Sequence, residues 1–477
     1  MNYTIIFNVL GNLLRFLGII MIVPLLVAVY YGEPLLPFAV AVVITGTLGI
    51  LLSRHYRAVG DWKIRDGFVI VVFGWLAAAL FGSIPFLFEG VTPINAVFET
   101  MSGFTSTGAT ILVDIEAYSK SLLFWRSMTQ WIGGMGIIVL VIAILPKLGV
   151  AGRQLFRAEA PGPMEDKLKP RIRGTAKILW SVYIAISALE VIALLLAGLS
   201  LYDALTNTFS TMGCGGFSPY GDSIATFNSP LVEGIITLFM FIAGASFALH
   251  YRTLYSDKKS LIKDEEFRVY SLVLITLTLI LALVLWQDSY PSILEAFRYS
   301  VFQIVSISTA TGFATADFNL WSDSAKFVII AAMFVGGCSG SAAGGIKVVR
   351  SLLFIKLSLR ELFRLLHPRS VKPITFNGKP VSENVVLSIV SFLGLYLLLS
   401  FFTAFVLAIQ GLDIVSSLTA SFATIGNIGP GLNLVGPWGN FDMIPFFGKV
   451  MLIGNMLFGR LELFTVFVLL LPEFWKE

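Results

Sequence analysis

Long runs of apolar residues alternate with short polar connections along almost the whole chain. A helix needs about 20 mainly apolar residues to cross the hydrocarbon core of a bilayer. Ten segments approach this requirement: 5–30, 35–53, 67–89, 121–146, 175–199, 229–251, 267–287, 324–363, 383–410 and 442–471. The segment 324–363 is too long for one span and contains a Gly-rich interruption. The pattern therefore predicts an all-α polytopic membrane protein with about ten transmembrane helices.

The basic residues are gathered in alternate connections. The connections 54–66, 147–177, 252–268 and 347–379 contain 25 of the 33 Lys and Arg residues, whereas none lies between Lys177 and Arg252 or between Lys379 and Lys449. Lys and Arg that flank membrane spans tend to remain cytoplasmic. We therefore expect a multi-pass protein of the cell membrane with both its N- and C-termini in the cytoplasm.

Four segments on the opposite, outer side are too apolar for solvated loops and too short or Gly-rich for full spans. Each begins near a residue able to cap a helix, namely Asn95, Asp203, Ser292 and Asp413. Each ends in small or hydroxyl-bearing residues. Because non-helical backbone at membrane depth is tolerated only where it lines a cavity or is packed inside protein, we interpret these segments as re-entrant and expect a path between them.

The four re-entrant segments end in similar four-residue stretches, which we call the filter segments. They are Thr-Ser-Thr-Gly at 105–108, Gly-Cys-Gly-Gly at 213–216, Thr-Ala-Thr-Gly at 309–312 and Gly-Asn-Ile-Gly at 426–429. Each is preceded and followed by one span, so the unit of span, pore helix and span occurs four times. The expected domains are an N-terminal two-helix extension at 1–66 and repeats at 67–146, 174–255, 266–363 (with a broken second helix) and 382–472. Four repeats in the same sense predict pseudo-fourfold symmetry around one pore.

The filter segments have the chemistry of a cation site. A short helix that ends halfway across the membrane directs the negative end of its dipole, roughly half an elementary charge, at the centre. Glycine then permits backbone turns that direct carbonyls at an ion. None of the four segments contains Asp or Glu, which favours K⁺ over Ca²⁺ or Na⁺. The candidate K⁺ ligands are Thr107, Gly108, Gly215, Gly216, Thr311, Gly312, Ile428 and Gly429. The alternative is that these glycines only allow close helix packing.

Composition excludes several classes of protein. With 56% hydrophobic and 13% charged residues, the chain is not an ordinary soluble enzyme. A net charge of +4 gives no indication of nucleic-acid binding. Two cysteines cannot form a disulfide framework, and three histidines beside basic segments do not suggest a metal cluster. We expect no catalytic residues and no cofactor in this chain, only K⁺ as the bound substrate ion.

At the filter segments the chain resembles the Trk/Ktr/HKT superfamily of cation transporters, and most closely its TrkH-type potassium uptake proteins. The resemblance rests on Phe-Glu-Thr-Met-Ser-Gly-Phe-Thr-Ser-Thr-Gly-Ala from 98, Gly-Gly-Phe-Ser-Pro from 215, Ser-Thr-Ala-Thr-Gly-Phe from 308 and Asn-Ile-Gly-Pro-Gly from 427. It implies K⁺ (and Rb⁺) uptake, and Gly108 agrees because plant relatives with Ser there transport Na⁺. It also implies a homodimer and a cytosolic TrkA-like nucleotide-binding ring, with NAD(H) or ATP/ADP bound to that partner.

The interruption of segment 324–363 is the candidate gate loop, Gly336–Gly345. Glycine costs about 1 kcal/mol relative to alanine inside a helix, so a stretch containing Gly336, Gly337, Gly340, Gly344 and Gly345 is not expected to be a stiff helix. The resemblance implies that this loop blocks the pore below the filter and moves aside. The alternative is a tight helix crossing through small residues.

Arg460 lies in the middle of the last apolar segment, where a charge is costly and indicates function. The resemblance implies that it points into the pore, as part of the gate. The alternative is a structural pair with Glu190 or with loop carbonyls. Glu462 is only two residues away and is expected to face elsewhere. We interpret Glu99 and Glu190 as structural support for the pore helices.

Two other functions compete with a K⁺-selective, channel-like transporter. A Na⁺-permeable or ion-coupled secondary transporter also has broken helices, although usually in two inverted repeats. A membrane-embedded enzyme needs a nucleophile and base or a metal set, which the spans lack. The basic connection 347–379 is the expected docking surface for the cytosolic partner.

Overall fold

The computed structural model describes residues 1–56, 63–136 and 172–476. Within these residues six helical segments are long and apolar enough to cross a membrane by themselves: Tyr3–Tyr31, Leu36–His55, Arg65–Phe88, Ala176–Leu196, Glu265–Asp288 and Glu383–Ile409. Each coincides with a segment predicted from hydropathy. The chain is therefore a multi-pass membrane protein, as predicted.

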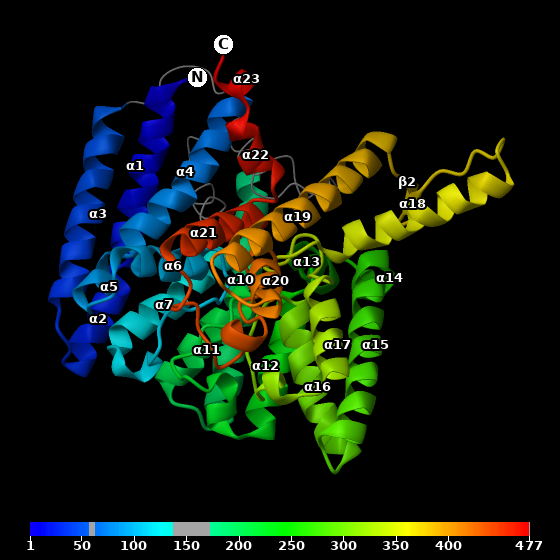
Figure 1. Cartoon of the computed structure of the whole chain (residues 1–477). Helices are drawn as coiled ribbons and strands as arrows, with labels where there is room; N and C mark the ends of the chain where they lie inside the picture. Colours follow the sequence, from blue (N-terminus) through cyan, green and yellow to red (C-terminus); the bar gives the residue numbers. More distant parts are fainter. Residues whose placement is uncertain (57–62, 137–171, 477) are drawn as a thin grey trace.

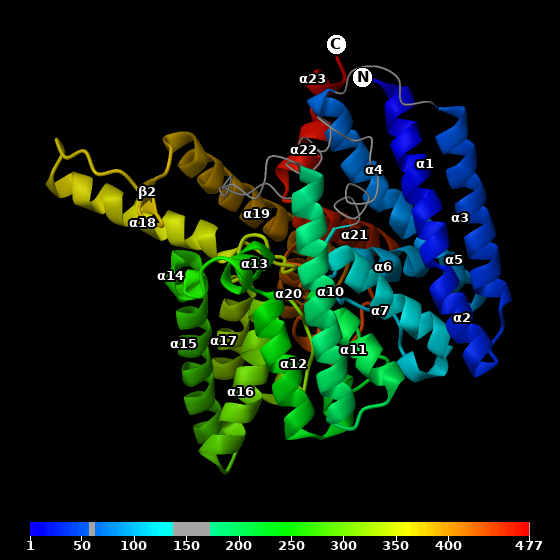
Figure 2. The ribbon, with the colours of Figure 1, turned by 180° about the vertical axis from the view of Figure 1, so that it is seen from behind.

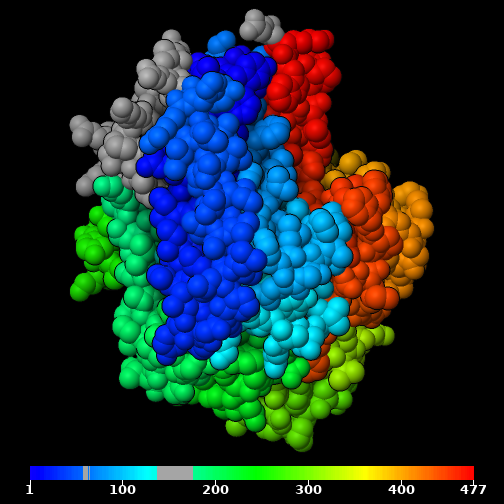
Figure 3. Space-filling model, turned by 90° about the vertical axis from the view of Figure 1, so that its left-hand side faces the viewer, coloured from blue at the N-terminus to red at the C-terminus, as the bar shows by residue number. Residues whose placement is uncertain are grey.

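The N-terminal extension consists of α1 (Tyr3–Ile20), α2 (Ile22–Tyr31) and α3 (Leu36–His55), which cover one face of the molecule in Figure 3. Glycines allow α1 and α3 to approach backbone to backbone. A Cβ added at Gly49 would lie 2.4 Å from the amide nitrogen of Arg15, and one at Gly11 would lie 2.6 Å from that of Ser53. Small residues at such crossings are the usual means of packing helices in a membrane.

Each of the four repeats begins with a span and continues with a pore helix. The first spans are α4 (Ile64–Gly82, extended by α5, Ile84–Phe88), α10 (Ile172–Leu196), α15 (Glu265–Asp288) and α19 (Glu383–Ile409). The pore helices are α6 (Pro93–Phe104), α11 (Leu201–Gly213), α16 (Ile293–Ser308) and α20 (Ile414–Ile425). After each filter segment the chain forms a short 3₁₀ helix: η1 (Ile115–Ala117), η2 (Ser223–Phe227), η3 (Phe318–Leu320) or η4 (Asn433–Val435).

The second helix of the repeats is interrupted more often than the sequence predicted. It is α7 (Lys120–Gly134) in the first repeat, where the expected continuation at 137–146 lies outside the described residues. In the second repeat α12 (Pro230–Ala243) and α13 (Phe247–Tyr255) meet at 94°. The third repeat has α17 (Asp323–Met333) and α18 (Val348–Leu366) on either side of the gate loop, as expected. The fourth has α21 (Phe446–Arg460) and α22 (Phe464–Leu470).

The single helices expected at 229–251 and 442–471 are therefore wrong. In the fourth repeat Glu462 and Leu463 take positive φ angles of 58° and 51°, which an α-helix does not allow. Hydropathy did not reveal either break, because the long apolar runs on both sides outweigh the few polar residues at each break, which are Ser246 in the second repeat and Arg460 and Glu462 in the fourth.

An arm extends from the body of the molecule in Figures 1 and 2. It consists of α18, a two-stranded hairpin of β1 (Thr375–Phe376) and β2 (Lys379–Pro380), and the beginning of α19. Asn377 and Gly378 form the turn with φ angles of 48° and 74°, and an Asn-Gly dipeptide favours such hairpin turns. The short helices α14 (Ser260–Lys263) and α23 (Pro472–Trp475) complete the described elements.

Burial is greatest at the centre of the repeats. Every residue of α20 from Ser421 to Ile425 is buried, and so are the hydroxyl-bearing residues at the ends of α6 and α16. In contrast, spans such as α15 expose large apolar side chains, including Leu272, Ile275 and Leu283. Polar groups inside and apolar groups outside are the arrangement that a bilayer favours, and they place the filter segments at the protected centre.

Candidate functional site

Three of the four pore helices begin with a side-chain cap. Ser292 and Asp413 cap α16 and α20, as predicted. The other two predicted caps are wrong. Ser200 caps α11 and receives the amide hydrogen of Asp203, whereas α6 starts after Thr92 with Pro93 in its first turn. Asp203 and Asn95 are each the third residue of their helix and lie in its first turn.

Both misassigned residues instead hold loops that follow filter segments. Asn95 donates to Asp442 at 2.8 Å and accepts a hydrogen bond from Lys449 at 2.8 Å. Asp203 accepts a hydrogen bond from the Tyr220 hydroxyl at 2.9 Å. Partial burial, together with this hydrogen bond, raises the pKa of Tyr220 to about 12.

The four filter segments share one backbone conformation. Ser106, Cys214, Ala310 and Asn427 have φ angles of 55°, 52°, 57° and 51°, in the left-handed region that L-residues rarely adopt. Two residues later Gly108, Gly216, Gly312 and Gly429 have φ angles of 83°, 71°, 87° and 100°. The same pair of unusual angles at four matched places is strong evidence that the segments are structural repeats.

The segments form a closed ring. A Cβ added at Gly108 would lie 2.1 Å from the Gly215 carbonyl oxygen, and one at Gly216 would lie 2.1 Å from that of Thr311. A Cβ added at Gly312 would lie 2.1 Å from the Ile428 carbonyl oxygen, and one at Gly429 would lie 2.8 Å from that of Thr107. Each repeat therefore contacts the next, and the fourth contacts the first. All eight predicted ligand residues lie in this ring.

The ring is lined by uncharged polar groups. The Thr105 and Thr107 hydroxyls are 2.8 Å apart, as are those of Thr309 and Thr311. Asn427 donates to the Thr107 hydroxyl at 2.9 Å, which joins the fourth filter segment to the first. The four pore helices end just before these residues. Helix C-termini with carbonyls and hydroxyls favour a dehydrated monovalent cation.

A buried ion pair supports the first two filter segments. The carboxylate of Glu99 on α6 lies 2.6 Å from Nε of Arg126 on α7, and both side chains are almost fully buried. Glu99 also accepts the amide hydrogen of Ile111 at 2.9 Å, beyond the first filter segment. Arg126 donates to the Ser218 carbonyl at 2.8 Å, beyond the second. These contacts agree with the structural role predicted for Glu99.

Sequence reasoning did not identify Arg126. The signal was present, because a charged residue inside the apolar segment 121–146 requires a partner. The partner could not be chosen from the sequence, since several carboxylates were candidates.

The gate loop is a non-helical segment, so the alternative of a tight helix crossing is wrong. Gly336, Gly340 and Gly345 have φ angles of 70°, 78° and 77°, which explains why glycine is needed at these places. A Cβ added at Gly344 would lie 2.5 Å from the Gly426 carbonyl oxygen. The loop therefore lies against the fourth filter segment.

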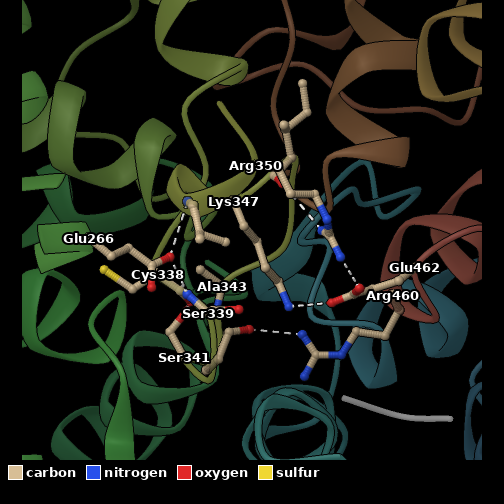
Figure 4. Close-up of polar contacts among 12 residues, drawn as sticks. Glu266, Cys338, Ser339, Ser341, Ala343, Lys347, Arg350, Arg460 and Glu462 are labelled. Atoms are coloured by element: carbon tan, nitrogen blue, oxygen red, sulfur yellow. Dashed lines mark hydrogen bonds and ion pairs between the residues drawn. The ribbon is translucent and has the colours of Figure 1, made fainter. Parts of the chain in front are cut away.

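Hydrogen bonds hold the gate loop to the break between α12 and α13. Cys338 donates its amide hydrogen to the Gly244 carbonyl at 2.8 Å, and Phe247 donates to the Gly340 carbonyl at 3.1 Å. On the other side, the buried carboxylate of Glu266 accepts the amide hydrogens of Ser339 at 2.7 Å and Val349 at 3.2 Å (Figure 4). Glu266, which sequence reasoning missed, thus contacts the loop and the start of α18.

Arg460 connects the gate loop to the first repeat. Its guanidinium donates to the Ala342 carbonyl at 2.8 Å and to the Gly134 carbonyl at 2.8 Å, and it also contacts the Gly133 carbonyl. Figure 4 shows the side chain directed at the loop. The expected proximity of Arg460 and the gate loop is therefore present in the structure. Arg460 stands at the end of α21, however, and not in the middle of a continuous span.

Glu462 pairs with two cations that follow the gate loop, and no ion pair between it and Arg460 was expected. Its carboxylate lies 2.6 Å from Nζ of Lys347 and also contacts Arg350, both just beyond the gate loop (Figure 4). The positive φ angle of Glu462 turns its side chain in a way that a continuous helix would not allow. Sequence reasoning assumed a continuous helix and did not identify Lys347 and Arg350 as the partners of Glu462.

Comparisons with known proteins give one consistent result. The model of the TrkH family, described as a cation transport protein, matches residues 38–476. The Trk system potassium uptake protein TrkH of Salmonella typhimurium is 40% identical over 97% of this chain and 100% of that protein. TrkH of Vibrio parahaemolyticus is 39% identical over the full length of both chains, and TrkG of Escherichia coli K12 is 33% identical over 99% of each.

A solved structure matches the whole fold. The crystal structure of the potassium transporter TrkH from Vibrio parahaemolyticus aligns with a TM-score of 0.90, 37% sequence identity and coverage of 100% of both chains. The correspondence includes the two-helix extension and the arm, since no part of either chain is left out.

Proposed function

The chain belongs to the TrkH family of cation transport proteins, and from this premise we propose that it takes up K⁺ through the ring of its four filter segments. As a member of a transport family it is not an enzyme, in agreement with the sequence prediction. The relatives named above are described as potassium uptake proteins, which supports K⁺ as the substrate.

The observation that carries this proposal is the closed ring of glycines and carbonyls. Backbone oxygens that replace the water shell of an ion suit K⁺, because K⁺ gives up its water more readily than Na⁺. The filter segments contain no carboxylate that would favour divalent cations. The proposed ligands are Thr107, Gly108, Gly215, Gly216, Thr311, Gly312, Ile428 and Gly429.

We place the gate of this pathway at the gate loop and Arg460. The gate loop lies against the fourth filter segment, and Arg460 hydrogen-bonds both to this loop and to the end of α7, so the loop and Arg460 are in direct contact next to the filter. A guanidinium has five donors and no acceptor, and it therefore binds carbonyls while repelling cations. In the proposed closed state the loop obstructs the pathway, and its displacement opens the pathway.

The regulatory partner and the assembly complete the proposal. The protein is proposed to lie in the cell membrane as a homodimer, with both termini in the cytoplasm and repeats at 67–146, 174–255, 266–363 and 382–472. A cytosolic TrkA-like ring that binds NAD(H) or ATP/ADP would regulate it. The arm supports this role because Arg369 and Lys372, which follow α18, are exposed, and the connection 147–177 contains eight Lys and Arg residues.

Expression in a bacterial strain without its own K⁺ uptake systems tests the function. We expect the chain to restore growth at low K⁺ concentration when its nucleotide-binding partner is co-expressed, because uptake through the ring would replace the missing systems. Growth and cellular K⁺ and Na⁺ contents are measured, with Gly312→Ala as the matched inactive control. Growth that depends on added Na⁺, or accumulation of Na⁺ instead of K⁺, would favour the alternative of a Na⁺-permeable or ion-coupled transporter.

A further inference from the structure

The second filter segment differs from the other three in its third residue. The residue before the ring glycine is Thr107, Thr311 or Ile428 in the first, third and fourth segments, and Gly215 in the second. A β-branched side chain restricts the backbone and packs against its surroundings. Gly215 supplies neither effect, so the second segment requires support from elsewhere.

The side chain of Gln130 fills the missing volume. A Cβ added at Gly215 would lie 2.4 Å from Cδ of Gln130 and 2.7 Å from both of its terminal atoms. The amide therefore occupies the place that a Thr or Ile side chain takes in the other segments. Gln130 is fully buried and lies on α7, in the repeat before the segment that it contacts.

The same amide makes two hydrogen bonds to the second filter segment and the residue beyond it. Nε2 donates to the Gly215 carbonyl at 2.7 Å, and Oε1 accepts the amide hydrogen of Phe217 at 2.9 Å. A carbonyl only accepts and an N–H only donates, so this orientation of the amide is the one that satisfies both partners. The two bonds lie on either side of Gly216, the ring glycine, and restrain its peptide units.

The equivalent residues of the other repeats are methionines. The N-caps of the second helices are Ser119, Ser229, Ser322 and Pro445. At the same distance beyond each N-cap the chain has Gln130, Met240, Met333 and Met456, all buried. Contacts three residues further along support this alignment of the repeats. A Cβ added at Gly133 would clash with the last carbonyl of α6, and one added at Gly459 would clash with the last carbonyl of α20. When each of these residues is paired with the filter segment of the next repeat, each Met is paired with a Thr or Ile, and Gln130 is paired with Gly215.

We propose that Gln130 is a positioning residue for ion selectivity, which holds the Gly215 and Gly216 carbonyls in the ring in place of a filter side chain. The inference rests on the proposed K⁺ uptake and adds a determinant to it. Gln130 acts through the backbone that it binds, since one N–H of its amide and its amide oxygen are hydrogen-bonded to backbone groups. The ring therefore has one segment whose geometry depends on an amide from the neighbouring repeat.

A double-variant cycle in liposomes tests this role. Gln130→Met installs the residue that the other repeats use and removes both hydrogen bonds. We expect the ratio of Rb⁺ to Na⁺ flux to fall at least about threefold, the order expected for losing neutral hydrogen bonds. Gly215→Thr alone clashes with Gln130 and should reduce Rb⁺ flux strongly. The double variant recreates the Met and Thr combination of the neighbouring repeats, and its Rb⁺/Na⁺ ratio should recover to within about twofold of the unmodified protein, because the two sites are coupled.

Controls separate the possible failures. Met240→Leu changes the equivalent position in the second repeat without removing a side-chain hydrogen bond, and it should leave the ratio unchanged. If the unmodified protein does not distinguish Rb⁺ from Na⁺, the proposed K⁺ uptake fails. If it does, an unchanged ratio in a folded Gln130→Met variant, even with lower total flux, overturns the role of Gln130. If the single variant Gln130→Met does not fold, the double variant of Gln130→Met and Gly215→Thr provides the test. A loss of selectivity in the double variant as severe as in Gly215→Thr would contradict the proposal.

Discussion

Replacement of Gly108 by serine should lower the ratio of K⁺ to Na⁺ flux at least about tenfold, because an uncommon backbone angle and a steric clash act together. Gly108 has a φ angle of 83°, and any Cβ at this position would lie 2.1 Å from the Gly215 carbonyl oxygen. The carbonyl must move for the side chain to fit. The ring would then lose the geometry that replaces the water shell of K⁺, while a hydroxyl that suits the smaller Na⁺ would be added.

Gly90→Ser is the matched control for this prediction. Gly90 has a φ angle of 82°, almost the same as that of Gly108, but nothing lies within 4 Å of its added Cβ. The Gly90→Ser variant therefore reproduces the cost of the backbone angle without the clash between the added side chain and a carbonyl oxygen. Flux of Rb⁺ and Na⁺ through both variants in liposomes gives the comparison. Equal selectivity of the Gly108 and Gly90 variants would show that the ring does not select the ion.

Replacement of Arg460 by alanine should raise the basal flux at least about tenfold in the absence of the regulatory partner. The variant loses hydrogen bonds to the Ala342 and Gly134 carbonyls, each of which is charge-assisted and worth about 1.5–3 kcal/mol. The gate loop is then released from α7, and the positive charge that repels cations is gone. Selectivity should be retained, since the filter segments are not changed.

The gate loop and Arg460 should also be coupled. Deletion of residues 339–341 should raise basal flux by itself, and the double variant should differ from the sum of the single effects by roughly 0.5–3 kcal/mol, because the deletion displaces Ala342, whose carbonyl Arg460 binds. Arg15→Ala, an exposed arginine of the N-terminal extension, is the control. Basal flux that stays at the level of the unmodified protein in each variant, or strictly additive effects, would assign the loop and Arg460 a purely structural role.

The sequence predicted the features that depend on composition and repetition. The membrane spans follow from hydropathy, because a bilayer requires long apolar helices. The four filter segments follow from matched glycines, and the structure places all four in one ring with the same backbone angles. The order of neighbours around the ring could not be derived from spacing, since it depends on how each repeat packs against the next.

The errors of prediction have local causes. The cap predicted at Asp203 is wrong because Ser200, three residues earlier, forms the better signal of Ser followed by an acid at the third position. For α6 the signal was Pro93, which favours the first turn of a helix. Both signals are visible in the sequence once the cap and the first turn are distinguished.

The breaks in the second helices could not be predicted from hydropathy. Leu461 and Leu463 are as apolar as the residues of a continuous span, yet the chain turns between them. Glu462 takes a positive φ angle there, and its carboxylate lies beside Lys347 and Arg350. A buried carboxylate between two cations offsets backbone strain through tertiary contacts, and such contacts are not encoded in the local pattern.

The central claim is that the four filter glycines and their carbonyls surround the transported K⁺, and anomalous X-ray scattering from Rb⁺ tests it most directly. Crystals of the unmodified protein grown with Rb⁺ should show an anomalous peak enclosed by Gly108, Gly216, Gly312 and Gly429. Excess K⁺ should remove the peak, whereas the same excess of Na⁺ should leave it. Absence of a peak within the ring, or removal by Na⁺ as readily as by K⁺, would contradict the assignment of the ring as a K⁺-selective filter.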